Sequence, residues 1–346
     1  MSQFSNFPSN ITQNARILIS PLDWGLGHAT RCIPLIDTLI SRYNARITVA
    51  AEGAQRAVIQ EAFPALPFLS IPGYKIKYHK NRAATIAGLV FSLPRIVRTI
   101  ELERQWLADL LRHEKFDIII SDNRYGLYHP SIPSYLLTHQ LLVKTAFGAI
   151  ADRLVQQRLY KWINRFTECW VPDYEAEPSL AGELSHPKKM PAITVRYLGP
   201  LSRLKAVTAD GKIELLAILS GPEPQRSLLE KKIRDQWDRN PGESMVMVQG
   251  LPGGETRTCQ QNNLTIYSHV NGEALSQLVA NASRIVCRSG YSSLMDLLPL
   301  GKDCVVVPTP GQTEQEYLAS FLAAEGRVRM MLQKDFDLAS ILEPGR

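Results

Sequence analysis

Apolar runs and helical patterns alternate along the first half of the chain. Runs typical of buried strands cover residues 16–20 (RILIS), 45–51 (ARITVAA), 116–121 (FDIIIS) and 133–138 (PSYLLT). Helix-type periodicity covers residues 32–40 and 96–113. Short strands that alternate with helices predict a parallel sheet with helices on both faces.

The second half repeats this alternation after a segment rich in glycine, proline and small polar residues. It opens with the run 213–226 (IELLAILSGPEPQR) and a helical pattern through Trp237. Further strands are predicted at 244–249, 264–267, 285–287 and 304–308, and helices at 272–280, 291–300 and 315–325.

These patterns divide the 346 residues into four expected parts. We expect a disordered polar leader at 1–14, an N-terminal domain at 15–200, a linker at 201–212 and a C-terminal domain at 213–346. Both domains are predicted to be doubly wound, Rossmann-like α/β domains that face each other across a cleft. Ligands bind such sheets at the carboxyl ends of the strands, near the point where the strand order reverses.

Composition and charge narrow the class of protein. Hydrophobic residues make up 45% and charged residues 21% of the chain, as in ordinary globular proteins. The N-terminal residues lack the apolar core of a secretory signal, and no run of 18 apolar residues indicates a spanning helix. The five cysteines show no CxxC spacing, so we expect a cytoplasmic protein without disulfides or zinc. The net charge of +6 favours anionic partners, but no Lys/Arg block is long enough to indicate nucleic acid.

The first group of chemically suggestive residues lies in 21–31 (PLDWGLGHATR), directly after the first predicted strand. Gly25 and Gly27 allow the backbone to approach a ligand, and a helix that begins here offers backbone N–H groups to anions. His28 is suited to proton transfer near neutral pH, and Arg31 lies one helical turn further on. The alternative is a plain strand-to-helix turn with a surface histidine.

The second group lies in 286–319. Its polar and glycine residues, in chain order, are Arg288, Ser289, Gly290, Asp296, Gln315 and Glu316. Serine and glycine at a helix N-terminus can hold a diphosphate through backbone N–H groups, and an acidic residue further into that helix can accept both hydroxyls of a ribose. Taken one by one, the same residues also fit ordinary helix capping.

The order of this second group resembles the C-terminal part of family 28 glycosyltransferases, whose peptidoglycan N-acetylglucosaminyltransferases act on a lipid-linked muramyl-pentapeptide. GLGHATR resembles the glycine-rich first loop of that family, and also the G-H-x-x-R loop of nucleotide-sugar hydrolases of the pseudaminic-acid pathway. The resemblance implies a GT-B architecture with a UDP-sugar in the C-terminal domain and an acceptor in the N-terminal domain. It also implies that no metal ion or other cofactor is needed.

The resemblance also implies roles for single residues. Ser289 and Gly290 would contact the diphosphate, and Asp296 would contact the ribose. The residues expected at the hydroxyls of the sugar are Gln315 and Glu316.

The expected catalytic base is His28, and Arg288 or Ser220 would help to stabilise the leaving diphosphate. The chain departs from the family at Asp296, where glutamate is usual, and at Glu316, where glutamine is usual. A third departure is the sequence SGPEP at 220–224, which replaces the family's G-G-S-x-G loop with prolines that have no N–H to donate.

Four further residues are acceptor-side candidates: Arg31, Asp122, Arg124 and His139. Asp122 and Arg124 follow the predicted strand 116–121, and His139 follows the run 133–138. In parallel sheets these positions lie at the same edge as His28. A capped turn and an ordinary structural histidine are the alternatives.

Residues 74–98 combine basic side chains with the apolar run 86–93. This pattern suits peripheral contact with an anionic membrane, at the inner face of the cytoplasmic membrane and near a lipid-linked acceptor. The alternative is a core-packing helix with solvated charges.

The predicted function is transfer of a sugar from a UDP-linked donor to an acceptor hydroxyl, with inversion at the anomeric carbon. The first alternative is a nucleotide-sugar hydrolase or epimerase in which His28 activates water. The second alternative is a protein that binds nucleotide sugars without turnover.

Overall fold

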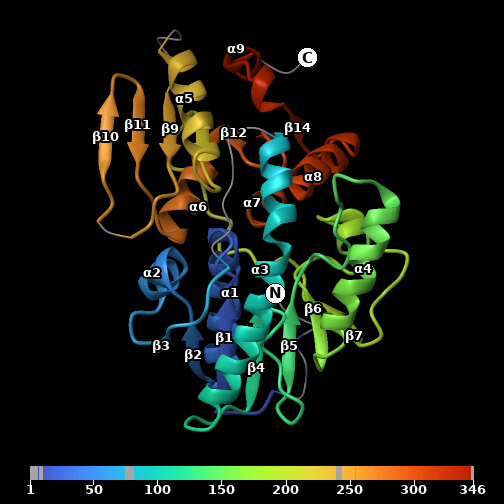
Figure 1. The fold of residues 1–346 in the computed structure, drawn as a ribbon. Coiled ribbons are helices and arrows are strands. Elements are labelled where there is room, and N and C mark those ends of the chain that lie inside the picture. Colours follow the sequence, from blue (N-terminus) through green and yellow to red (C-terminus); the bar gives the residue numbers. More distant parts are fainter. Residues whose placement is uncertain (1–6, 8–10, 75–81, 239–243, 254, 344–346) are drawn as a thin grey trace. The chain divides into compact units, whose positions relative to one another are not determined.

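The computed structural model describes residues 7, 11–74, 82–238, 244–253 and 255–343 (Figure 1). By its contacts the chain divides into two compact units, which are Met1–Ile76 with Leu89–Leu201, and Lys77–Gly88 with Ser202–Arg346. Each unit is built on one seven-stranded sheet with helices on both faces. The predicted pair of doubly wound α/β units is confirmed.

The first sheet is parallel throughout. Its strands are β1 (Arg16–Pro21), β2 (Arg46–Ala50), β3 (Phe68–Leu69), β4 (Ile118–Asp122), β5 (Ser134–Leu137), β6 (Glu168–Val171) and β7 (Thr194–Tyr197). Their order is β3-β2-β1-β4-β5-β6-β7, so the winding reverses between β1 and β4. The apolar runs predict β1, β2, β4 and β5, whose side chains are largely buried because helices cover both faces.

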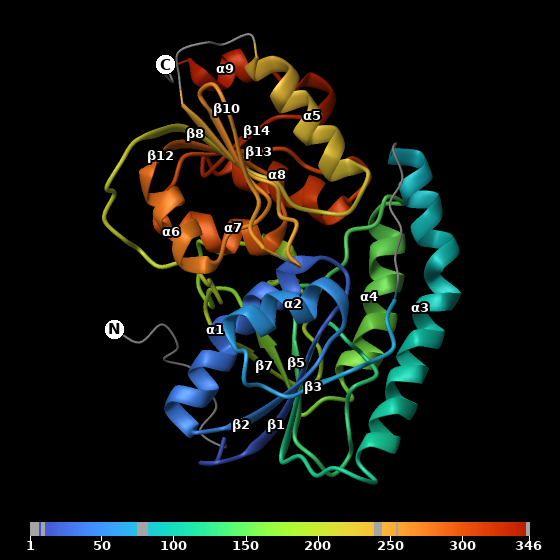
Figure 2. The ribbon, with the colours of Figure 1, turned by 90° about the vertical axis from the view of Figure 1, so that its left-hand side faces the viewer.

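The helices of the first unit lie on opposite faces of this sheet. They are α1 (Leu26–Tyr43), α2 (Gly53–Ala62), α3 (Arg82–Leu110), α4 (Ala149–Ile163) and the short 3₁₀ helix η1 (Gly182–Leu184). Figure 2 shows α1 and α2 on one face, and α3 and α4 on the other. The helix predicted at 96–113 corresponds to the C-terminal part of the longer α3. The first residues of α3, up to Gly88, are assigned to the second unit by their contacts.

The second sheet is parallel except at one edge. Its strands are β8 (Ile213–Ile218), β9 (Met245–Val248), β10 (Thr258–Gln261), β11 (Leu264–Tyr267), β12 (Ala282–Cys287), β13 (Cys304–Val306) and β14 (Arg329–Met330). Their order is β10-β11-β9-β8-β12-β13-β14, and β10 pairs antiparallel with β11. The winding reverses between β8 and β12.

The helices of the second unit follow the predicted pattern closely. They are α5 (Gln225–Trp237), α6 (Gly272–Asn281), α7 (Tyr291–Leu297), η2 (Leu298–Leu300), α8 (Thr313–Ala324), η3 (Gln333–Asp335) and α9 (Leu338–Leu342). The helix predicted at 291–300 is α7 followed by η2, and it ends at Gly301, which has a left-handed φ of 66°. Ile233 and Trp237 of α5 are buried on the sheet with Leu215 and Met247, each contributing about 1.5–3 kcal/mol of burial.

The expected leader and linker contain packed residues. Most of the expected leader lies outside the described residues, but Ile11 is buried and the backbone N–H of Asn14 donates to the last residue of α1. In the expected linker, the hydroxyl of Ser202 donates to Asp296 Oδ1 at 2.8 Å. The beginning of the linker is thus part of the second unit.

Two glycines of the second unit have the same left-handed backbone but differ in the space around them. Gly250 has a φ of 68°, and a Cβ at this position would lie 2.4 Å from the carbonyl oxygen of Leu219, just beyond β8. Gly301 has almost the same φ, 66°, with nothing within 4 Å of its Cβ position. Alanine at either position costs about 1–2 kcal/mol for the left-handed backbone. We expect Gly250→Ala to lose about 1–3 kcal/mol more than Gly301→Ala, because it adds an overlap. Urea unfolding of the two variants measures this difference, and equal losses would contradict the close approach.

Candidate functional site

The first candidate site lies where the first sheet reverses its winding. β1 ends at Pro21 and β4 ends at Asp122, and these two residues are partners in the register of the sheet. Gly25, with a φ of 95°, precedes the first residue of α1. His28 and Arg31 therefore lie in the first turns of α1, three residues apart and on one side of the helix. The predicted glycine-rich loop is thus largely a helix N-terminus.

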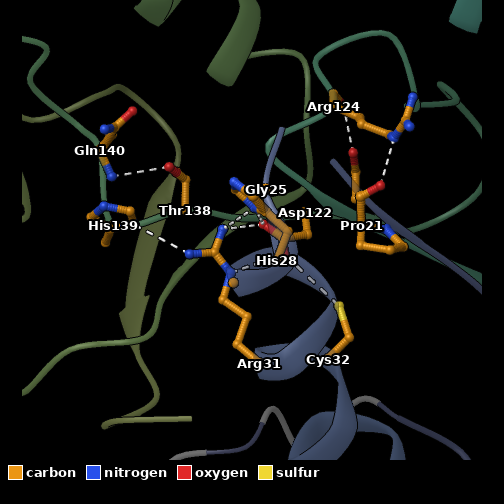
Figure 3. A network of polar contacts seen from close by, with 12 residues as sticks. Pro21, Gly25, His28, Arg31, Cys32, Asp122, Arg124, Thr138, His139 and Gln140 are labelled. Atoms are coloured by element: carbon orange, nitrogen blue, oxygen red, sulfur yellow. Dashed lines mark hydrogen bonds and ion pairs between the residues drawn. The ribbon is translucent and has the colours of Figure 1, made fainter. Parts of the chain in front are cut away.

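His28 and Asp122 form a hydrogen-bonded pair, which we call the dyad (Figure 3). His28 Nδ1 lies 3.0 Å from Asp122 Oδ1. The Asp122 side chain is fully buried, whereas the His28 side chain is 15% exposed. A carboxylate at Nδ1 favours the tautomer that carries its hydrogen there, which leaves Nε2 to accept a proton. The dyad therefore has the geometry of a general base with its orienting group.

Arg31 joins the dyad to a second histidine. Its Nε donates to Asp122 Oδ2 at 2.9 Å, and its Nη2 donates to Asp122 Oδ1. Nη2 also lies 2.9 Å from His28 Nδ1, and Nη1 lies 3.2 Å from His139 Nδ1. Figure 3 shows these side chains converging from α1 and from the ends of β4 and β5. The structure thus brings together four of the predicted site residues.

These four side chains differ in solvent exposure, and therefore in how much of each side chain an acceptor could contact. Arg31 and Asp122 are almost completely buried, with 2% and 0% of their side chains exposed, and His139 is also buried. His28 is the most exposed member of the group. Contact of the other three with an acceptor stays a prediction.

The charges in this group favour a neutral imidazole beside an ionised carboxylate. Burial would raise the pKa of the Asp122 carboxyl, but the charges of Arg31 and His28 outweigh burial and hold this pKa at about 2. Burial lowers the pKa of His28 below its usual value; the charge of Asp122 opposes this effect and the charge of Arg31 adds to it. At neutral pH His28 is therefore ready to accept a proton.

Arg124, the remaining acceptor-side candidate, forms hydrogen bonds to two loops and to α3 of the first unit. Its Nε donates to the carbonyl of Pro21, and its Nη1 donates to the carbonyl of Pro72 and to Glu103 Oε1, each at 2.8 Å. Only 1% of Arg124 is exposed. These bonds fix the end of β1 next to α3, and contact of Arg124 with an acceptor stays a prediction.

Glu103, which was not among the predicted site residues, is a partner of Arg124. It lies in α3 and also accepts a hydrogen bond from the hydroxyl of Tyr74 at 3.0 Å. The sequence does contain a signal for it, because Glu103 stands three residues after Ile100 and four before Leu107, on the apolar stripe of the helix. A charged residue on such a stripe indicates a buried partner.

The second candidate site lies where the second sheet reverses its winding. β8 and β12 are neighbours there, with Ile218 opposite Cys287. The loop with Ser220 follows β8, and the predicted group that begins at Arg288 follows β12. Gly290 precedes the first residue of α7, and this glycine at the N-cap position has no side chain with which to cap the helix. Such a helix N-terminus is suited to phosphate groups.

Arg288 and Ser289 are both fully buried and hold this edge of the sheet together. The guanidinium of Arg288 donates to the carbonyls of Val307 at 3.1 Å and Gln225 at 2.6 Å. The hydroxyl of Ser289 donates to the carbonyl of Gln315 at 2.8 Å. Contact of these residues, or of Ser220, with a diphosphate stays a prediction.

Asp296 has partners from the expected linker, which the sequence patterns did not indicate. Its Oδ1 accepts from the hydroxyl of Ser202 at 2.8 Å and from the backbone N–H of Arg203 at 3.2 Å. Arg203 Nε lies 3.7 Å from Oδ2. Burial raises the pKa of Asp296, and the charge of Arg203 opposes that effect. Binding of a ribose by Asp296 stays a prediction.

Gln315 and Glu316 shape the loop between β13 and α8. Gln315 Oε1 accepts from the backbone N–H of Thr309, and Glu316 Oε1 accepts from that of Gly311, both at 2.9 Å. Arg82 Nε also donates to Glu316 Oε1, at 3.1 Å. Both side chains thus have partners within the second unit, and their predicted contact with sugar hydroxyls stays a prediction.

Some polar atoms at this edge lack a partner. Among the described residues, the buried polar atoms without a hydrogen bond include Arg288 Nε, Thr309 Oγ1 and Gln312 Oε1. These residues follow the carboxyl ends of β12 and β13. An unmet buried polar atom costs about 1–3 kcal/mol, which a polar ligand or a water molecule can recover.

Comparison with known proteins relates part of the second unit to a glycosyltransferase family. Residues 253–344 match the Glycosyltransferase family 28 C-terminal domain. An uncharacterized glycosyltransferase of Methanosarcina acetivorans is 22% identical over 337 residues, which cover 91% of this chain and 85% of the relative.

Solved structures agree on the fold of the whole chain. The glycotransferase of kitacinnamycin has a TM-score of 0.64 at 14% identity, covering 95% of this chain and 90% of its own. MurG of Acinetobacter baumannii has a TM-score of 0.52 at 13% identity, covering 95% of this chain and 88% of its own. At such identities the likeness shows the fold, which is the GT-B architecture implied by the sequence resemblance.

Acid should weaken the first unit through Asp122. Its pKa in the fold is about 2, below the ordinary 3.8. Its charged form therefore stabilises the fold above pH 3.8, and about 2 kcal/mol is lost as the pH falls towards 2. Asp122→Asn removes this titration, so its free energy of unfolding should fall less steeply over that window. The variant should also be less stable at neutral pH, because Arg31 loses its buried partner.

Urea unfolding at several pH values between 2 and 6 measures both effects. The matched control is Asp109→Asn, which removes a carboxylate paired with Arg112 at the surface of the same unit. Equal acid slopes in Asp122→Asn and the unmodified protein would contradict the low pKa of Asp122.

Proposed function

We propose that this chain, a glycosyltransferase of the GT-B type, moves a sugar from a UDP-linked donor bound by its second unit to a hydroxyl of an acceptor bound by its first. The observation that carries the proposal is the 3.0 Å contact between His28 Nδ1 and Asp122 Oδ1. It supports proton removal at the point of the fold where ligands bind. The family 28 signature in 253–344 supports a nucleotide sugar as the second substrate.

In the proposed mechanism His28 acts as the general base. Nε2 takes the proton of the acceptor hydroxyl while the hydroxyl oxygen attacks the anomeric carbon of the donor. The bond from that carbon to the diphosphate oxygen breaks, and the nucleoside diphosphate leaves with the electron pair. Asp122 stabilises the imidazolium that forms. Direct displacement inverts the anomeric carbon.

In the second unit the N-terminus of α7, which has glycine at its N-cap position, would hold the diphosphate. Backbone N–H groups after Gly290 and the positive end of the helix stabilise negative charge that grows on the leaving group. Asp296 would accept the ribose hydroxyls, and Gln315 and Glu316 those of the sugar. The unmet polar atoms near β12 and β13 support a polar ligand at this edge. Because these groups can carry the charge, we propose that transfer needs no metal ion.

For the acceptor we propose a lipid-linked molecule at an anionic membrane surface. α3 exposes apolar side chains, with 84% of Phe91 and 55% of Leu93 accessible to solvent. The neighbouring Arg95 and Arg98 are exposed as well, and basic residues beside an apolar face favour anionic lipid. Residues 75–81 of the expected contact segment lie outside the described residues.

α3 also meets the simple criteria for a membrane-spanning helix. Its most apolar window has a mean hydropathy of 1.4, with 18% of that window buried. Length and composition alone are weak evidence for spanning, and our proposal is surface contact.

Hydrolysis of the donor is the alternative activity, because the same dyad could activate a water molecule. Transfer and hydrolysis differ in whether turnover needs an acceptor. The glycosyltransferase names of the relatives favour transfer.

The purified protein should bind one member of a panel of UDP-, GDP- and dTDP-sugars and release little free nucleotide without an acceptor. With a membrane extract as the source of acceptor, release should rise. His28→Ala should lower this rate about 100- to 10,000-fold while leaving donor binding unchanged, because it removes only the base. Calorimetry measures binding, and nucleotide release measures turnover with and without EDTA.

The matched control is His113→Ala, which changes an exposed histidine of the first unit. Rapid release without acceptor that disappears in His28→Ala would favour the hydrolase. Donor binding with full turnover in His28→Ala would contradict the proposed base, and loss of turnover in EDTA would contradict metal independence.

Membrane contact should depend on the exposed face of α3. The double variant Phe91→Ser, Leu93→Ser should bind phosphatidylglycerol vesicles at least about tenfold more weakly, since two apolar side chains no longer enter the lipid. Cosedimentation measures binding. Leu332→Ser is the control, because Leu332 is 41% exposed but belongs to the second unit. Equal binding by the double variant and the unmodified protein would contradict the proposal.

A further inference from the structure

We infer that Arg31 is a positioning residue of the dyad, which orients Asp122 towards His28 and balances its charge so that the imidazole stays unprotonated. This inference rests on the proposed function, because it concerns the base that takes the acceptor proton. Arg31 cannot act by touching much of a substrate, since only 2% of its side chain is exposed.

The first part of the argument is orientation. The guanidinium of Arg31 is a planar fork whose donors have fixed directions. Nε holds Asp122 Oδ2 at 2.9 Å, and Nη2 holds Oδ1. The carboxylate is thereby fixed at both oxygens, with Oδ1 directed at His28 Nδ1. Arg31 Nη1 in turn reaches His139 Nδ1 at 3.2 Å, which fixes the far end of the fork.

The second part is charge. Asp122 and Arg31 together carry no net charge, so a proton on His28 leaves the group at +1. Without Arg31 the same proton would neutralise the carboxylate, and it would be held more firmly. Two other titratable side chains near this group are Cys32 and His139. Cys32 donates to Asp122 Oδ2 at 3.8 Å, and burial raises the pKa of its thiol, so it adds no charge near neutral pH.

One more ionisable group lies close to the end of β4. Tyr125 is partly buried, and its pKa is raised mainly by burial, so it is a neutral phenol near neutral pH. Arg31 is therefore the cation that balances Asp122 among the described residues that face the dyad. Its effect is to let His28 work as a base at a lower pH than a dyad without it.

The test compares Arg31→Gln, which removes the charge, with Arg31→Lys, which keeps the charge but not the fork. The pKa of His28 is read from the imidazole Cε1–H signal of ¹³C-labelled protein, assigned through its loss in His28→Gln. We expect Arg31→Gln to raise this pKa by about 1 unit or more, and Arg31→Lys to leave it near the unmodified value. The control is Arg16→Gln, which breaks a surface pair with Asp117 and should not move the His28 signal.

Kinetics of nucleotide release give the second readout. The acidic limb of kcat/KM should move to higher pH in Arg31→Gln, together with the pKa of His28. Arg31→Lys should lower kcat about tenfold or more with little change in the KM for the donor, because the base is misaligned while donor binding is untouched.

An unchanged His28 pKa in folded Arg31→Gln would overturn the charge balance, and full kcat in Arg31→Lys would overturn the orientation. If Arg31→Gln does not fold, the pKa of His28 in Arg31→Lys tests the charge balance instead. This variant keeps the positive charge, so a pKa of His28 well above the unmodified value would overturn the inference. The NMR titration needs no substrate. A shifted pKa together with an active His28→Ala would therefore refute His28 as the proposed base and leave the charge balance between Arg31 and Asp122 intact.

Discussion

The first unit depends on one buried carboxylate. Asp122 ends β4 with no exposed side-chain surface, and an isolated charge in such a place would cost several kcal/mol. Two donors of Arg31 and the ring of His28 offset that cost. Stability and chemistry therefore depend on the same contacts, because the hydrogen bonds that offset the burial of the Asp122 charge also orient the imidazole.

Both candidate sites follow from one property of the fold. Where a sheet reverses its winding, the connections leave neighbouring strands towards opposite faces, and the strand ends remain accessible to a ligand. In the first sheet this point lies between β1 and β4, and in the second between β8 and β12. The chain uses the same position twice, with a proton acceptor in one unit and a helix N-terminus that begins after glycine in the other.

Local patterns in the sequence predict most helices and the central strands of both sheets, because hydrophobic period and turn residues are local properties. They miss β3, β6, β7, β10 and β14, which lie towards the sheet edges. They also place His28 and Asp122 at strand ends. They cannot supply the bond between these residues, which are 94 positions apart, because strand order is set by packing of the whole unit. The same limit hides Ser202, whose glycine- and proline-rich neighbourhood reads as a linker although its hydroxyl binds Asp296.

The sequence SGPEP at 220–224 also has a physical consequence. The loop after β8 leads into α5, where Glu223 accepts from the backbone N–H of Ser227 at 3.3 Å and pairs with Arg226. A carboxylate of the chain itself therefore occupies the positive end of that helix, as in ordinary capping. At the neighbouring strand, α7 begins after Gly290, which as a glycine has no carboxylate to offer at this end of the helix. Of the two helices that flank the reversal point, α7 is therefore the one suited to an external anion. This difference between the two N-termini favours a diphosphate site next to β12 rather than next to β8.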